Sequence, residues 1–115
     1  MAVNNPQKSA KELVSVSDWN ACLNSGDNML VLSCKVTTSD SSATIEGVGL
    51  ILNSAQGATL ASLYTELSGG VESASPALNL APGNLAVGDT VDAVVSGEVG
   101  TQHYFFDQKL TIGIC

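Results

Sequence analysis

This 115-residue chain has a single histidine, His103, and four lysines but no arginine, and the histidine is the side chain best suited to general-base chemistry. Asp107 follows His103 by four residues, and a histidine oriented by an aspartate is the general base that activates a serine nucleophile. On one extended strand, however, four residues of rise separate the two Cα atoms by about 13 Å, too far for the orienting hydrogen bond. We therefore predict that the protein is not an enzyme.

Two further groups of residues could hold a nucleophile or a metal ion. Cys34 and His103 could form a thiol–base pair, although a cysteine in an apolar strand is usually part of the core. Asp89 and Asp92, with Asn84 on a nearby turn, offer the oxygen ligands that calcium uses, but not at the spacing of a dedicated calcium loop. We expect no resident cofactor, and Asp89 and Asp92 are only weak calcium candidates.

The sequence has a single cluster of aromatic residues, formed by Tyr104, Phe105 and Phe106. Because successive side chains on a strand point to opposite faces, three adjacent rings cannot all be buried, and at least one must be exposed. An exposed ring could contact a partner protein or a sugar. These three residues are therefore the interface candidates of the sequence.

The elements that position these residues are predicted from a period-two alternation of apolar and polar residues between Asn28 and Cys115. A hairpin is expected across residues 54–57, although the leucines of its second arm are spaced three and four apart and also allow a helix. The predicted strands are residues 29–37, 44–53, 58–67, 77–80, 90–98 and 104–114.

The amino-terminal part of the chain is less regular. Residues 1–12 predict a flexible arm, and residues 13–115 a single domain. Between residues 13 and 24, Val14 and Val16 alternate as in a strand, whereas a start at Ser17 and a stop at Gly26 favour a short helix. We expect the helix, with Trp19 and Cys22 on one side.

These elements predict an antiparallel two-sheet β-sandwich, immunoglobulin-like or jelly-roll-like, with one short amino-terminal helix. Residues 80–99 and 103–114 resemble, in rhythm only, the closing strands of immunoglobulin-like domains. They lack the cysteine and tryptophan landmarks of that family, so the resemblance implies an architecture and not a family.

Composition and charge restrict the partners and the location. A formal charge of −7 without arginine disfavours nucleic acid and anionic membranes. Residues 1–12 lack the apolar core of a secretory signal, and no run reaches the about 18 apolar residues of a membrane helix. We expect a protein that is cytoplasmic as synthesised and can be incorporated in a virion. We also expect Cys22, Cys34 and Cys115 to be reduced, with a disulfide between two of them as the alternative.

Only 13% of the residues are charged, and short hydroxyl side chains lose little entropy when two surfaces meet. We therefore expect a non-enzymatic structural protein that self-associates as a homo-oligomer or decorates a larger particle, such as a viral capsid or fibre. The alternative is a small lectin-like module that binds carbohydrate, with or without calcium. An enzyme with an unfamiliar site is the third and least favoured hypothesis.

Overall fold

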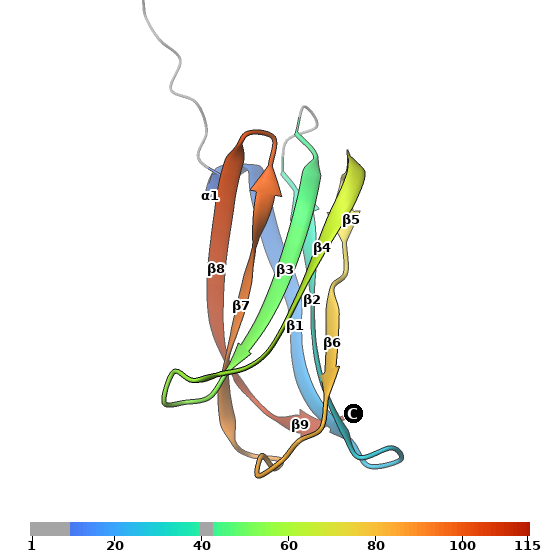
Figure 1. Cartoon of the computed structure of the whole chain (residues 1–115), viewed down its shortest axis with the longest axis vertical. Helices are drawn as coiled ribbons and strands as arrows, with labels where there is room; N and C mark the ends of the chain where they lie inside the picture. Colours follow the sequence, from blue (N-terminus) through green and yellow to red (C-terminus); the bar gives the residue numbers. More distant parts are fainter. Residues whose placement is uncertain (1–9, 40–42) are drawn as a thin grey trace, which may run out of the picture.

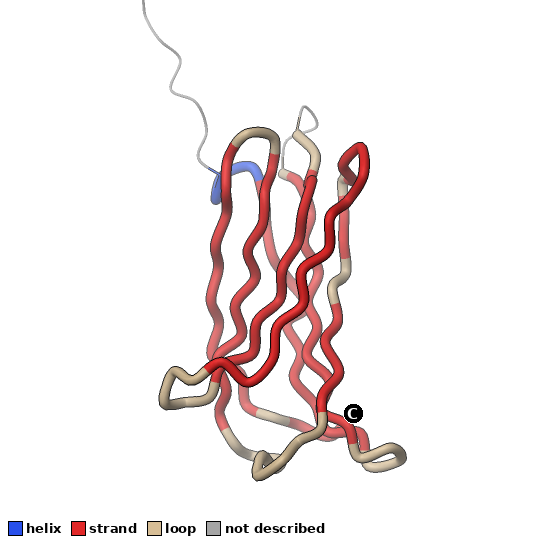
Figure 2. The backbone as a smooth tube through the Cα atoms, in the orientation of Figure 1, coloured by secondary structure: helices blue, strands red, loops and turns tan. Residues whose placement is uncertain are grey.

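The computed structural model describes residues 10–39 and 43–115, which form an elongated sandwich of two facing β-sheets (Figure 1). The predicted β-sandwich is confirmed. Figure 2 shows that strands make up most of the described chain and that α1 (Ala10–Leu13) is a single turn. Of the predicted arm, residues 1–9 lie outside the described residues, and Ala10 to Glu12 belong to α1.

The two sheets divide the strands unequally, into five and four. In the five-stranded sheet β2 is central, because it pairs with β1 on one side and with both β5 and β6 on the other. Its strands are β1 (Val14–Asn24), β2 (Met29–Thr38), β5 (Ser73–Ala74), β6 (Ala77–Leu80) and β9 (Gly113–Ile114). The four-stranded sheet has the order β4-β3-β7-β8, from β3 (Ile45–Asn53), β4 (Thr59–Val71), β7 (Thr90–Val99) and β8 (Gln102–Thr111).

The core lies between the sheets and is built from alternate residues of the central strands. On β7, Val91, Ala93 and Val95 are fully buried, as the period-two pattern predicts. The facing residues of the other sheet include Leu30, Leu32 and Val36 on β2. Alternation therefore decides which face of each central strand is buried.

The predicted helix between residues 17 and 24 is wrong, because this segment belongs to β1 and pairs antiparallel with β2. The register shifts between Ser17 and Asn20, where Asp18 has a φ of 55°. A bulge of this kind adds a residue to the period-two alternation. Val16 and Trp19, which both pack against the core, lie on the two sides of the bulge and so fall three apart, which resembles helical spacing.

The predicted hairpin of β3 and β4 is confirmed, and the helical alternative for its second arm is wrong. Gly57, with a φ of 91°, closes the turn by donating its N–H to the Ser54 carbonyl over 2.9 Å. The strand continues beyond the predicted end, to Val71, through Gly69 and Gly70 at positive φ. There four residues of β4 stand opposite Glu46 alone on β3, so the regular pairing of β4 ends at Glu66.

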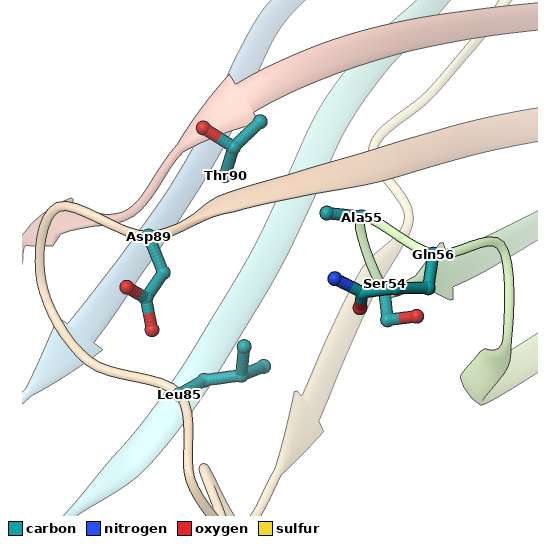
Figure 3. Close-up of a pocket in the computed structure, with 6 residues that line it drawn as sticks. All are labelled: Ser54, Ala55, Gln56, Leu85, Asp89 and Thr90. Carbon is teal, nitrogen blue, oxygen red and sulfur yellow. The ribbon is translucent and has the colours of Figure 1, made fainter.

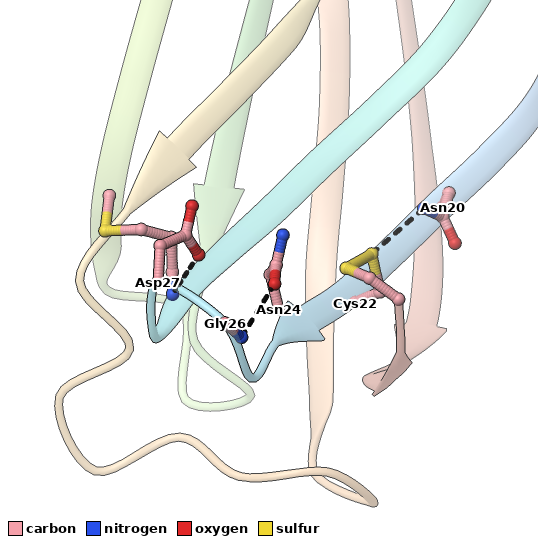
Figure 4. The surroundings of a disulfide bond; sticks show 7 residues. Asn20, Cys22, Asn24, Gly26 and Asp27 are labelled. Atoms are coloured by element: carbon pink, nitrogen blue, oxygen red, sulfur yellow. Dashed lines mark hydrogen bonds between the residues drawn. A yellow bond between two sulfur atoms is a disulfide. The ribbon is translucent and has the colours of Figure 1, made fainter.

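A disulfide joins Cys22 on β1 to Cys115, with a Cα–Cα distance of 5.0 Å and a sequence separation of 93 (Figure 4). The chain leaves β8, crosses to the other sheet and pairs β9 in parallel with β1, where the Cys115 N–H donates to the Leu23 carbonyl over 3.2 Å. The expectation of three reduced thiols is therefore wrong. Only Cys34 is free, and it is buried.

Candidate interaction surface

The residues that could form a catalytic pair are held apart by the sheets. His103 and Asp107 lie on the same strand, β8, where they pair with Glu98 and Val94 of β7. The His103 side chain is exposed, with Nδ1 3.9 Å from Glu98 Oε1. Cys34 belongs to β2 in the other sheet and is in the core, where burial raises the pKa of its thiol to about 11. The Cys34 thiol is thus held in its protonated form.

This buried thiol predicts a loss of stability in alkali. In the unfolded chain Cys34 ionises near pH 9.0, whereas in the folded protein it stays protonated to about pH 11. Across this window the unfolded state binds fewer protons, so the free energy of unfolding falls as pH rises. We expect the wild type to lose roughly 2 kcal/mol more than Cys34→Ala between these two pH values, in urea unfolding. Equal losses in the two proteins would contradict this role of Cys34.

The two calcium candidates have different partners. The carboxylate of Asp89 accepts the Ala86 N–H over 2.9 Å within the turn before β7. Asp92, on β7, forms an ion pair with Lys109 of β8 over 3.5 Å. Within residues 10–39 and 43–115 no group of three or more histidine, cysteine or acidic residues could hold a metal ion. Asp89 and Asp92 thus make separate interactions, the first within a turn and the second between β7 and β8.

Asp89 also borders a cavity of about 250 Å³ between the β3–β4 turn and the loop before β7 (Figure 3). In the figure the Asp89 carboxylate is the only charged group among the residues drawn. Ser54 and Gln56 of the turn and Thr90 supply the polar atoms, and Leu85 and Ala55 the apolar ones. One carboxylate with neutral neighbours gives this cavity weak electrostatic attraction for a cation.

The three aromatic candidates have separate environments. Tyr104 is 2% exposed and donates its hydroxyl to the Gly47 carbonyl over 2.9 Å, and burial raises the pKa of this hydroxyl. Phe106 is half-buried, with its ring centroid 6.2 Å from that of Tyr104. Phe105 is 55% exposed, which confirms that at least one ring is exposed. Of the three, Phe105 alone presents a largely exposed ring to a partner.

A surface that sequence analysis missed lies on β4, at the edge of the four-stranded sheet opposite β8 (Figure 1). In the described part of the chain, residues 59–66, which we name the β4 edge, pair with β3 along one side and with no strand along the other. Three large side chains there are exposed by more than 40%: Leu60, Leu63 and Tyr64. Glu66 is the only charged residue of the whole strand, which has no lysine or proline. With Glu66 as its single charge, the β4 edge has little of the charge that usually protects an edge strand.

The opposite edge of the same sheet differs. On β8 the exposed side chains include charged or titratable groups at His103, Asp107 and Lys109. In addition, α1 and β1 contact β8, so this side of the sandwich is partly closed. Charged side chains and the contacts with α1 and β1 thus protect β8. The β4 edge is less protected in both respects.

An apolar groove runs along the inner side of the β4 edge, between β4 and the strands β5 and β6 of the other sheet. Leu63 belongs to this side, because it pairs with Leu50, which is fully buried. The groove has a volume of about 350 Å³ and is lined mainly by Val48, Leu63, Leu67, Val71, Ala74 and Pro76. We name it the side groove.

On the outer side of the β4 edge, the Tyr64 ring lies over two glycines of β3. A Cβ atom on Gly49 would come 3.0 Å from the ring, and one on Gly47 would meet the hydroxyl. The hydroxyl donates to Glu98 on β7, and this hydrogen bond, with burial second, raises the pKa of Tyr64 to about 12. An aromatic ring over cross-strand glycines covers backbone that their missing side chains would leave exposed, as Tyr64 does here.

Comparisons with known proteins add no relative: no family model, no curated protein and no solved structure matches the chain. Among the described residues, no helix has the length and apolar character needed to cross a membrane.

Proposed function

We propose that the protein is a non-enzymatic assembly protein that self-associates through the β4 edge. By self-association it can build or decorate a larger particle, such as a viral capsid or fibre. The observation that carries the proposal is a strand edge that no other described strand pairs, combined with the exposed side chains of Leu60, Leu63 and Tyr64. Unpaired backbone N–H and C=O groups pair readily with another strand, and exposed apolar side chains add contact area.

The strand order supports an immunoglobulin-like version of the sandwich. In the constant-type form of that fold the first, second, fourth and fifth strands form one sheet, and the third joins the last two in the other. Here β1 and β2 pair alongside β5 and β6, and β3 pairs with β7, which pairs with β8. β4 then takes the place of the added edge strand of variable-type domains, which leaves it at the rim of the four-stranded sheet.

The disulfide supports a site of action in an oxidising environment. Disulfides persist in secreted proteins and on virion surfaces, and are rare where glutathione keeps thiols reduced. A bond between Cys22 and Cys115 is therefore better suited to an external particle than to the cytosol.

Light scattering coupled to size-exclusion chromatography tests self-association. We expect the weight-average mass to rise from the monomer value of 11.7 kDa towards that of an oligomer as concentration increases into the range of tens to hundreds of micromolar. A mass that stays at the monomer value across this range would overturn the proposal.

A further inference from the structure

We propose that the β4 edge pairs antiparallel with the β4 edge of a second copy, about a two-fold axis at Leu63, so that two four-stranded sheets become one sheet of eight strands. This inference rests on the proposed function and specifies its partner and register. A strand edge can pair antiparallel with the same edge of a second copy. The two-fold axis that relates the copies places the N–H and C=O groups of each strand opposite the matching groups of the other.

The alternation of β4 restricts the register. Leu63 lies on the inner face and Tyr64 on the outer face. The joined sheet has one continuous inner face only if inner-face residues of one copy pair with inner-face residues of the other. The two-fold axis must therefore set one residue opposite the same residue of the second copy, and cannot lie midway between two successive residues. Centred on Leu63, the pairing places Leu63 against its copy and Tyr64 against the small Ser62 of the partner.

Charge along the strand permits this pairing. In this register Glu66 lies opposite Leu60 of the other copy, about 20 Å from the second Glu66 along the strand. That separation exceeds the screening length of about 8 Å at physiological salt. Like charges therefore do not face each other, and the uncharged segment between Thr59 and Thr65 forms the centre of the contact.

The side groove gives the second copy apolar surface to cover. Leu63 is 43% exposed at the mouth of this groove, beside Leu67 and Val71. A strand added at the β4 edge would bring the partner's inner-face leucine over the same mouth, so each copy would shield the groove of the other. A partner that paired only backbone would leave this apolar surface in water.

The size of the contact predicts a weak dimer. Seven paired residues extend over about 23 Å of strand, which gives a smaller contact than the about 800 Å² per partner of a standard interface. Each copy also carries a formal charge of −7, and this mutual repulsion is screened by salt. We therefore expect the dimer to tighten as salt rises, whereas a complex with a basic partner would weaken.

Charge substitutions test the edge. Leu63→Lys sets two positive charges against each other at the axis and should raise the dissociation constant at least about tenfold in sedimentation equilibrium. Thr111→Lys, at an exposed position of β8 on the other edge of the sheet, should leave the dissociation constant unchanged. Ser62→Lys, at an exposed position of β4, replaces Leu63→Lys if circular dichroism shows that the latter does not fold.

Oxidative cross-linking tests the register. Leu63→Cys should form a disulfide-linked dimer, whereas Ser62→Cys should not, because its copy is displaced by two residues along the strand. Cys34 is buried, so wild-type protein provides the background. Cross-linking through Ser62→Cys alone would overturn the register. If the wild type is oligomeric but Leu63→Lys does not weaken the oligomer and Leu63→Cys does not cross-link it, β4 pairing is overturned and self-association stands. If the wild type is monomeric, both proposals are overturned.

Discussion

Replacement of both Cys22 and Cys115 by serine is expected to lower the free energy of unfolding by about 4–5 kcal/mol. The disulfide closes a loop with a sequence separation of 93, and a long loop restricts the unfolded chain more than a short one. Since a domain of this size is stable by about 5–15 kcal/mol, the loss is a large part of the total. Urea unfolding followed by tryptophan fluorescence or circular dichroism measures it.

Reductant provides the matched comparison. The wild type should lose the same free energy when reduced, and the double-serine variant should be insensitive to reductant. Cys34→Ala should keep the sensitivity of the wild type, because Cys34 is not part of the bond. A double-serine variant within about 1 kcal/mol of the oxidised wild type would show that the β1–β9 pairing alone holds the end of the chain.

Gly97→Ala is expected to destabilise the protein by about 3 kcal/mol or more. A Cβ atom at this position on β7 would overlap the backbone carbonyl of Gly47 and lie 2.7 Å from the Tyr104 hydroxyl. It would therefore separate β7 from β3 and break the buried hydrogen bond from Tyr104 to Gly47. Backbone cannot move aside as the end of a flexible side chain can. Thermal or urea unfolding measures the loss.

Gly113→Ala is the control for this substitution. Gly113 also lies on a strand, but the nearest atom to an added Cβ there is the Ala21 carbonyl oxygen, at 4.0 Å. Tyr104→Phe removes only the hydroxyl and should cost about 1–2 kcal/mol. A Gly97→Ala variant as stable as Gly113→Ala would show that β3 and β7 can separate without loss.

Local alternation predicted the strands whose residues are buried on one face, and failed where a bulge or a distant partner decides the structure. On β7 the pattern holds because each residue has a neighbour on both sides. On β1 the bulge at Asp18 breaks the period and produces helical spacing. β9 forms because the chain returns to β1 after 93 residues, which spacing along the sequence does not encode.

The candidate surface was only partly predictable for the same reason. The rule that adjacent rings alternate between faces predicted an exposed ring, and Phe105 is that ring. The β4 edge depends instead on β7 returning to the far side of β3, which leaves β4 with a single neighbour. The low charge of β4 and the glycines opposite Tyr64 were visible in the sequence, but only the strand order shows that they lie at a rim.

The covalent link between Cys22 and Cys115 also changes what a protease can accomplish. A single cut in the β3–β4 turn or in the loop before β7 falls inside the closed loop, so both fragments remain attached to each other. Such a nicked molecule keeps its mass on a non-reducing denaturing gel, and its two fragments separate there only when the disulfide is reduced. Release of the two fragments of a singly cut molecule would then require two independent events, cleavage and reduction.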